Sequence, residues 1–76
     1  MDKYGVILFN TSSAAIQAEA VLNKAGLNVK LIPTPRELSS DCGLSLRFDW
    51  KFIIEVQAHQ DNGRLDAAGI YPLPDG

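Results

Sequence analysis

The sequence predicts an α+β domain in which two helices pack on one face of a four-stranded antiparallel sheet. Three observations carry this prediction. Four apolar segments of strand length are spaced along the 76 residues. A segment with helical periodicity separates the first from the second, and another separates the third from the fourth. A long polar segment joins the two halves, so the element order is β-α-β, loop, β-α-β.

The first half begins with residues 4–9, a continuous apolar run that predicts a buried central strand. Asn10 to Ser13 can each cap a helix. Residues 14–25 are rich in alanine, and Gly26 is expected to end the helix that they form. Residues 28–32 alternate and predict a second strand, bounded by Pro33. The apolar face of the helix is expected to comprise Ala15, Ala18, Val21, Leu22 and Ala25.

The second half begins with residues 44–48, which alternate as a strand does. The core side is expected to hold Leu44, Leu46 and Phe48. Ser45 and Arg47 are expected on the other side of the sheet.

A second helix is predicted from residue 50 to about residue 60, with Asp49 as its N-cap and residues 62–63 as its end. Residues 52–56 are β-branched enough to compete as a strand, but the cap and stop signals favour the helix. A last strand is predicted around residues 65–71, followed by an irregular tail that begins at Pro72. The expected apolar stripe of the helix is Trp50, Ile53, Ile54, Gln57 and Ala58. Right-handed crossovers then give the ferredoxin-like split βαβ plan.

Composition bounds the class of protein. Residues 1–76 form one small domain, and 46% of the residues are hydrophobic, which is enough for a core. A chain of this size buries only about 60% of its unfolded surface, so a homodimer would be one way to hide the remaining apolar surface. The formal net charge is −2 and the seven basic residues are scattered, which argues against nucleic acid as a partner. No apolar run is long enough for a membrane span or a signal peptide, so we expect a cytoplasmic protein.

The long connection between the halves, residues 34–43, is the predicted functional site. Such connections are commonly about four to six residues long, and longer ones are often functional. Thr34, Pro35 and Glu37 fit a capping box, and Gly43 suits a C′ stop. One or two turns of helix are therefore expected, with Cys42 at their far end.

Cys42 is the only cysteine, so it cannot form an intramolecular disulfide. It is either a buried structural residue or a free thiol kept reduced, and its small polar neighbours favour the thiol. The C-terminal end of a short helix and Asp41 would both favour the neutral form, so no strongly activated cysteine is expected. Papain-like catalysis is not expected, because no histidine lies nearby in sequence. With His59 the only other soft ligand, neither a metal nor another cofactor is expected.

Arg36 is the second candidate. In the first turn of the short helix, its guanidinium and the free backbone N–H groups would hold a carboxylate, phosphate or other oxyanion. The competing interpretation is a solvated arginine, or one paired with Glu37. Ser39 and Ser40 would donate hydrogen bonds to the same anion, although serines in loops are more often turn formers. We therefore predict Thr34, Arg36, Ser39, Ser40 and Gly43 as ligand-binding residues around Cys42.

The same motifs resemble a family of small bacterial and archaeal proteins described as selenium/sulfur carrier-like. Its pattern is an apolar strand with Phe, an Ala-x-x-Ala-Glu helix, a Leu-Ile-Pro-Thr-Pro-Arg-Glu-x-Ser-x-x-Cys-Gly segment and a Leu-Arg-Phe strand. The chain matches it in order at Phe9, residues 15–19, residues 31–37, Ser39, residues 42–43, residues 46–48 and residues 69–71. It lacks the Cys-Pro helix start of selenium-metabolism proteins, so the resemblance implies only Cys42 as acceptor, with Arg36, Ser39 and Gly43 around it.

Three functions follow as hypotheses. In the first, Cys42 accepts sulfur or selenium from a donor enzyme as a persulfide or perselenide and passes it to an acceptor protein. Such a protein is a carrier rather than a turnover enzyme. In the second, the 34–43 loop binds a small anion or a protein without catalysis, and the cysteine is incidental. In the third, Cys42 is a redox-sensing thiol that pairs with a second protein.

Overall fold

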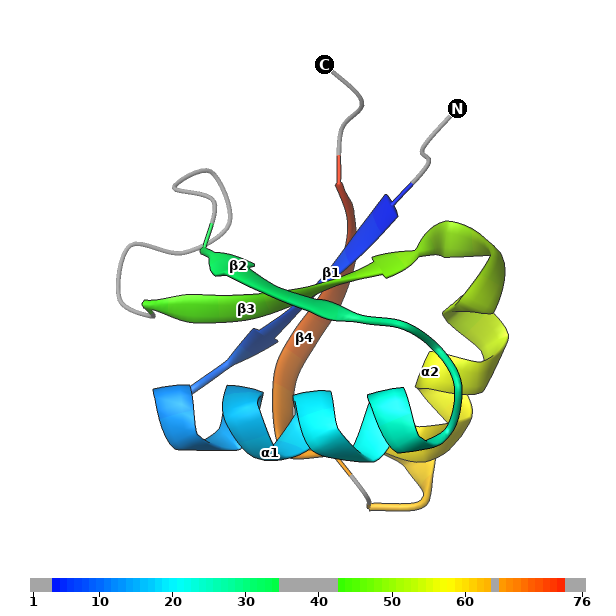
Figure 1. The fold of residues 1–76 in the computed structure, drawn as a ribbon, viewed down its shortest axis with the longest axis horizontal. Coiled ribbons are helices and arrows are strands. Elements are labelled where there is room, and N and C mark those ends of the chain that lie inside the picture. Colours follow the sequence, from blue (N-terminus) through cyan, green and yellow to red (C-terminus); the bar gives the residue numbers. More distant parts are fainter. Residues whose placement is uncertain (1–3, 35–42, 64, 74–76) are drawn as a thin grey trace.

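The computed structural model describes residues 4–34, 43–63 and 65–73. Their four strands form a single antiparallel sheet in the order β2-β3-β1-β4 (Figure 1). This order confirms the predicted ferredoxin-like split βαβ fold. The elements are β1 (Tyr4–Phe9), α1 (Ser12–Lys24), β2 (Lys30–Pro33), β3 (Leu44–Asp49), the 3₁₀ turn η1 (Trp50–Phe52), α2 (Ile53–Asp61) and β4 (Ala67–Leu73).

The main core lies between the sheet and the two helices. The central strands β1 and β3 supply most of the fully buried side chains, as their continuous or alternating apolar patterns predict. Helix α1 adds its small residues and one leucine, and α2 adds a single valine. The core side chains of these four elements are Ile7, Phe9, Leu46, Phe48, Ala15, Ala18, Leu22 and Val56.

Helix α1 begins two residues earlier than the sequence predicts. The Thr11 hydroxyl accepts a hydrogen bond from the Ala14 N–H at 3.1 Å, which fixes Thr11 as the N-cap. At the other end, Ala25 caps the helix and is exposed, although it was predicted on the apolar face. Gly26 follows with a φ of +85°, and so ends the helix as expected.

The second helical segment differs most from its prediction. Asp49 does act as a cap, since its carboxylate accepts from the Lys51 N–H at 3.1 Å, but one turn of 3₁₀ helix precedes α2. A 3₁₀ turn has three residues per turn, so it changes which side chains face the core. The predicted stripe is therefore wrong in part: Ile54 is 78% exposed, whereas Val56 is buried. Gln57 and Ala58 are exposed as well.

The two outer strands begin two residues later than expected. Asn28 has a φ of +53°, a left-handed conformation in which a strand cannot continue, so β2 starts at Lys30. The Asn23 side-chain oxygen accepts from the Val29 N–H at 2.8 Å and holds this turn against α1. In β4, the predicted tail residue Pro72 lies within the strand and pairs with Gly5. Leu65, predicted as the strand's start, is instead a buried core residue that precedes it.

The face of the sheet away from the helices is partly buried as well. Val6 and Leu8 alternate with the core residues of β1, yet they are 0% and 6% exposed. Ser45 is their neighbour on β3 and is 0% exposed. It lies on the predicted side, but among buried residues. Across the ranges that the structure describes, no helix has the length and hydropathy needed to cross a bilayer.

Candidate functional site

The predicted site is the connection between β2 and β3. The structure describes its two ends, Thr34 and Gly43. Residues 35–42 lie outside the described ranges, and with them Arg36, Ser39, Ser40, Cys42 and the turn of helix predicted after Thr34. Their roles stay predictions. The geometry described below is that of the base of the loop, meaning Thr34, Gly43 and the strand residues next to them.

The base of the loop is closed by backbone hydrogen bonding. Pro33 pairs with Leu44 as the last step of the β2–β3 ladder. One residue further, the Thr34 N–H donates to the Gly43 carbonyl oxygen at 3.4 Å. The two ends of the loop are therefore held side by side, and the loop is anchored at both ends to a central and an outer strand of the sheet.

A pair of hydroxyl groups lies beneath this closure. Thr34 Oγ1 and Ser45 Oγ are 2.7 Å apart, a short hydrogen bond in which either hydroxyl can donate. Because the Ser45 side chain is fully buried, Thr34 is the partner that satisfies it. The sequence marks Thr34 as a helix cap and ligand residue, but it does not show this bond. A polar residue in an alternating apolar strand was the only available signal.

Gly43 closes the described end of the loop. Its carbonyl oxygen accepts the hydrogen bond from the Thr34 N–H. The helix turn that Gly43 is predicted to end lies outside the described residues, so the C′ stop stays a prediction.

The base of the loop lies against the start of α1. Among the described residues, and its chain neighbours apart, a Cβ placed on Gly43 would have Ser12 Oγ as its nearest neighbour, at 3.9 Å. Ser12 is the first residue of α1, so Gly43 lies beside the positive end of the helix dipole, where backbone N–H groups have no partner within the helix. The cap signals at residues 10–13 predicted where the helix starts. Only the fold brings that start to Gly43, more than 30 residues away in sequence.

No group of three His, Cys, Asp or Glu side chains comes together to hold a metal ion within the described part of the chain. What the described end of the loop offers is hydroxyls, backbone groups and a helix N-terminus. These groups can hold and polarise an anion, but they supply neither a general base nor a nucleophile of their own.

Comparison with known proteins identifies a family. A family model with the description "Putative Se/S carrier protein-like" matches residues 4–72. No curated protein and no solved structure matches the chain. The matched range runs from the start of β1 to the penultimate residue of β4 and includes the whole 34–43 connection. The chain therefore belongs to the Se/S carrier protein-like family.

Proposed function

We propose that this protein carries sulfur or selenium on Cys42, between a donor enzyme and an acceptor protein. The family supports this class of function. The observation that carries the proposal is the position of Gly43, the residue after Cys42, beside Ser12 at the start of α1. A persulfide or perselenide is an anion at neutral pH, and the positive end of a helix dipole favours an anion.

The transfer step is an exchange at a sulfur atom. The Cys42 thiolate attacks the terminal sulfur of a persulfide on the donor, the donor's S–S bond breaks, and the donor's cysteine leaves as a thiolate. Cys42 then carries the new S–S bond and the terminal sulfur. The exchange involves no net oxidation, and the same step with a terminal selenium gives a perselenide. It needs a reduced thiol, which fits a cytoplasmic location.

The other loop residues have supporting roles in this proposal. Arg36 and the hydroxyls of Ser39 and Ser40 would steady the terminal anion. Thr34 already shares a hydrogen bond with Ser45, so we assign it to the base of the loop rather than to contact with the cargo. Gly43 places no side chain between this end of the loop and Ser12.

Intact mass spectrometry without reductant tests the carrier function. The protein is incubated with a cysteine desulfurase and either cysteine or selenocysteine, and the expected result is a mass gain of one sulfur or one selenium atom. Cys42→Ser should show no gain. Ser13→Ala, an exposed change on α1, is the matched control and should load like the wild type.

Labelling with a thiol reagent separates the alternatives. If Cys42 is labelled in the folded protein but never loaded, the carrier function is wrong. The loop is then better explained as a binding module, in which Arg36→Ala abolishes binding and Cys42→Ser is silent. If Cys42 is not labelled, both the carrier and the redox-sensing functions are excluded.

A further inference from the structure

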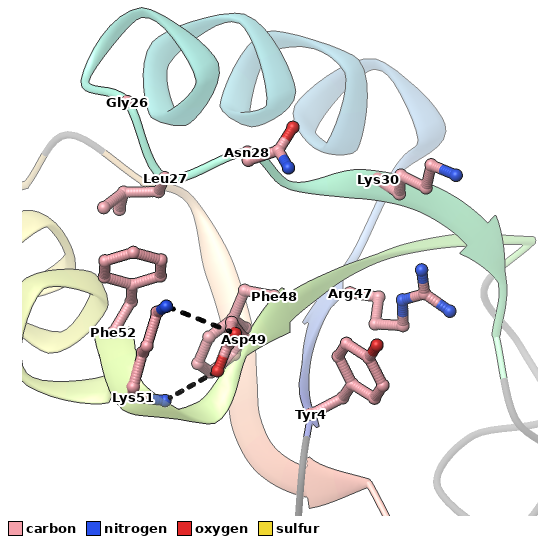
Figure 2. A pocket seen from close by; sticks show the side chains of 10 residues that line it. All are labelled: Tyr4, Gly26, Leu27, Asn28, Lys30, Arg47, Phe48, Asp49, Lys51 and Phe52. Carbon is pink, nitrogen blue, oxygen red and sulfur yellow. Dashed lines mark hydrogen bonds and ion pairs between the residues drawn. The ribbon is translucent and has the colours of Figure 1, made fainter.

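A groove of about 430 Å³ lies at the opposite end of β3 from the loop (Figure 2). It opens where the left-handed Asn28 turns the chain away from β3, so that the β2–β3 ladder ends at the pair Lys30–Arg47. The remaining residues of β3, Phe48 and Asp49, have no β2 residue opposite them and form one wall. The α1–β2 turn and η1 form the others. The lining residues are Tyr4, Gly26, Leu27, Asn28, Lys30, Arg47, Phe48, Asp49, Lys51 and Phe52.

The groove is positively charged in a negatively charged protein. Three cations, Lys30, Arg47 and Lys51, and one carboxylate, Asp49, line it, which gives a formal charge of +2 in a chain whose formal charge is −2. Lys51 Nζ and the Asp49 carboxylate are 3.9 Å apart, so this ion pair neutralises itself. The remaining positive charge belongs to Lys30 and Arg47.

Lys30 and Arg47 are like charges that face each other across the sheet. They are direct partners across the β2–β3 ladder, and Figure 2 shows their side chains extending in the same direction from neighbouring strands. Like charges directly opposite each other in a sheet are destabilising. No carboxylate of the described residues forms an ion pair with either of them. A bound anion between Lys30 and Arg47 would neutralise this repulsion. Anion binding therefore gives a reason for two like charges at paired positions of the sheet.

Arg47 is oriented for such a contact. Its guanidinium lies over the Tyr4 ring, 4.5 Å from the ring centre. Stacking occupies the face of the guanidinium and leaves the N–H groups at its edge available. These groups match two oxygens of a phosphate or carboxylate.

The other side of the groove is apolar. Leu27 and Phe48 are almost completely buried there, and the half-buried Phe52 ring lies beneath Lys51 Nζ, 5.2 Å from the ring centre. A ligand that fits both sides has a doubly charged anionic end and a small apolar or ring-shaped body, and the site has the volume of a small-metabolite pocket.

We propose that this groove binds a small organic phosphate monoester. Lys30 and the edge of the Arg47 guanidinium hold the phosphate, and the body of the ligand lies against the half-buried Phe52 ring. The site is separate from the thiol: five residue steps of β3, about 16 Å, lie between Leu44 beside the loop and Asp49 in the groove. The proposal does not depend on the carrier function.

Titration of the ¹⁵N-labelled protein with phenyl phosphate, followed by NMR, tests the proposal. We expect saturable shifts of the amide signals of Asn28, Lys30 and Arg47, with no shift at Thr34 or Gly43. Lys30→Gln and Arg47→Gln should each weaken binding about tenfold, as the loss of a charge-assisted contact does. Arg47→Lys keeps the charge but loses the planar donor pair, and should also bind less tightly.

Lys24→Gln is the matched control. It removes the same charge from an exposed position in the last turn of α1, outside the groove lining, and should change the affinity less than twofold. Equal weakening by Lys24→Gln and Lys30→Gln would mean attraction by net charge alone and would overturn the proposal. An absence of saturation, or shifts located elsewhere, would overturn it too.

Thermal unfolding separates a binding role from a structural one. Because Lys30 opposes Arg47, Lys30→Gln should raise the melting temperature of the free protein while it weakens phosphate binding. A lower melting temperature would show that Lys30 supports the fold, and the argument from the uncompensated pair would fail. Cys42→Ser should bind phenyl phosphate like the wild type.

Discussion

The two ends of β3 differ in chemistry although they belong to one strand. At the loop end the described residues are uncharged: Ser12, Thr34, Gly43 and Ser45 contribute hydroxyls, backbone and a helix start. The groove end gathers charged and aromatic side chains, with three cations around one carboxylate. Under the proposed carrier function the first would stabilise an anion formed on the thiol, whereas the second would attract an anion from solution. The structure therefore allows two separate binding functions, and substitutions should affect them independently.

The largest expected effect is a loss of unfolding free energy from a substitution in the tight packing at the groove end. Gly5 lies beneath the Phe48 and Trp50 rings, which stack with centroids 5.9 Å apart. A methyl group at Gly5 would collide with both rings. Gly5→Ala should therefore destabilise the fold by about 3 kcal/mol, as overpacking of a tight core does. Chemical denaturation measures the loss, and a loss below about 1 kcal/mol would show that the rings can move aside.

The hydroxyl pair at the loop end should contribute less. Thr34→Ala leaves the fully buried Ser45 hydroxyl without its described partner, and an unsatisfied buried hydroxyl costs about 1–2 kcal/mol. Thr34→Ser keeps the hydroxyl and is the control, with a loss well below that of the alanine variant. If the two variants are equally stable in denaturant titrations, the hydrogen bond does not hold the base of the loop.

Asp49 has two roles at the groove end: it caps η1, and it is the carboxylate that lowers the positive charge of the groove. Asp49→Ala removes the cap of η1 and should cost about 1 kcal/mol. Asp49→Asn retains a capping oxygen, and the exposed ion pair with Lys51 adds little, so its unfolding free energy should change by only a few tenths of a kcal/mol. Its groove has a formal charge of +3 instead of +2, and phenyl phosphate should bind more tightly. Weaker binding by Asp49→Asn would contradict the electrostatic account.

The smallest effect is expected at Gly43. Among the described residues, and its chain neighbours apart, a Cβ on Gly43 would meet Ser12 Oγ alone, at an ordinary contact distance of 3.9 Å. Gly43→Ala should therefore change the free energy of unfolding by less than about 1 kcal/mol, with a gain expected from the stiffer unfolded chain. The unfolding free energies of Gly43→Ala and Gly5→Ala, taken together, test whether an added methyl group finds space at the loop end and none at the groove end. A loss as large as that of Gly5→Ala would remove the contrast.

Sequence patterns predicted the elements whose signals are repeated along several residues. The continuous apolar run of β1 gave its bounds as observed, and the alanine-rich face of α1 gave the helix within two residues. Strand order followed from the β-α-β repeat and the handedness of crossovers. In the candidate site, only Thr34 and Gly43 lie within the described residues, and their pairing across the loop follows from the hairpin-like connection of β2 and β3.

The features that sequence could not predict depend on one backbone angle or on the assembled fold. The left-handed Asn28 delays β2 and opens the groove, but asparagine occurs in many other conformations. The 3₁₀ turn before α2 shifts its buried face, and nothing in the cap signal at Asp49 distinguishes it from an α-helix start. The proximity of Gly43 to Ser12 and the pairing of Lys30 with Arg47 join segments far apart in the chain, so no local pattern records them.

Each outer strand of the sheet contains a proline. Pro33 ends β2 and Pro72 lies within β4, and these two strands are the edges of the sheet. A proline at an edge removes a hydrogen-bond donor that another chain would need in order to extend the sheet. Aggregation by edge-to-edge pairing is therefore disfavoured on both sides. Under the proposed carrier function, an acceptor protein is therefore expected to dock through side-chain contacts rather than by adding a strand.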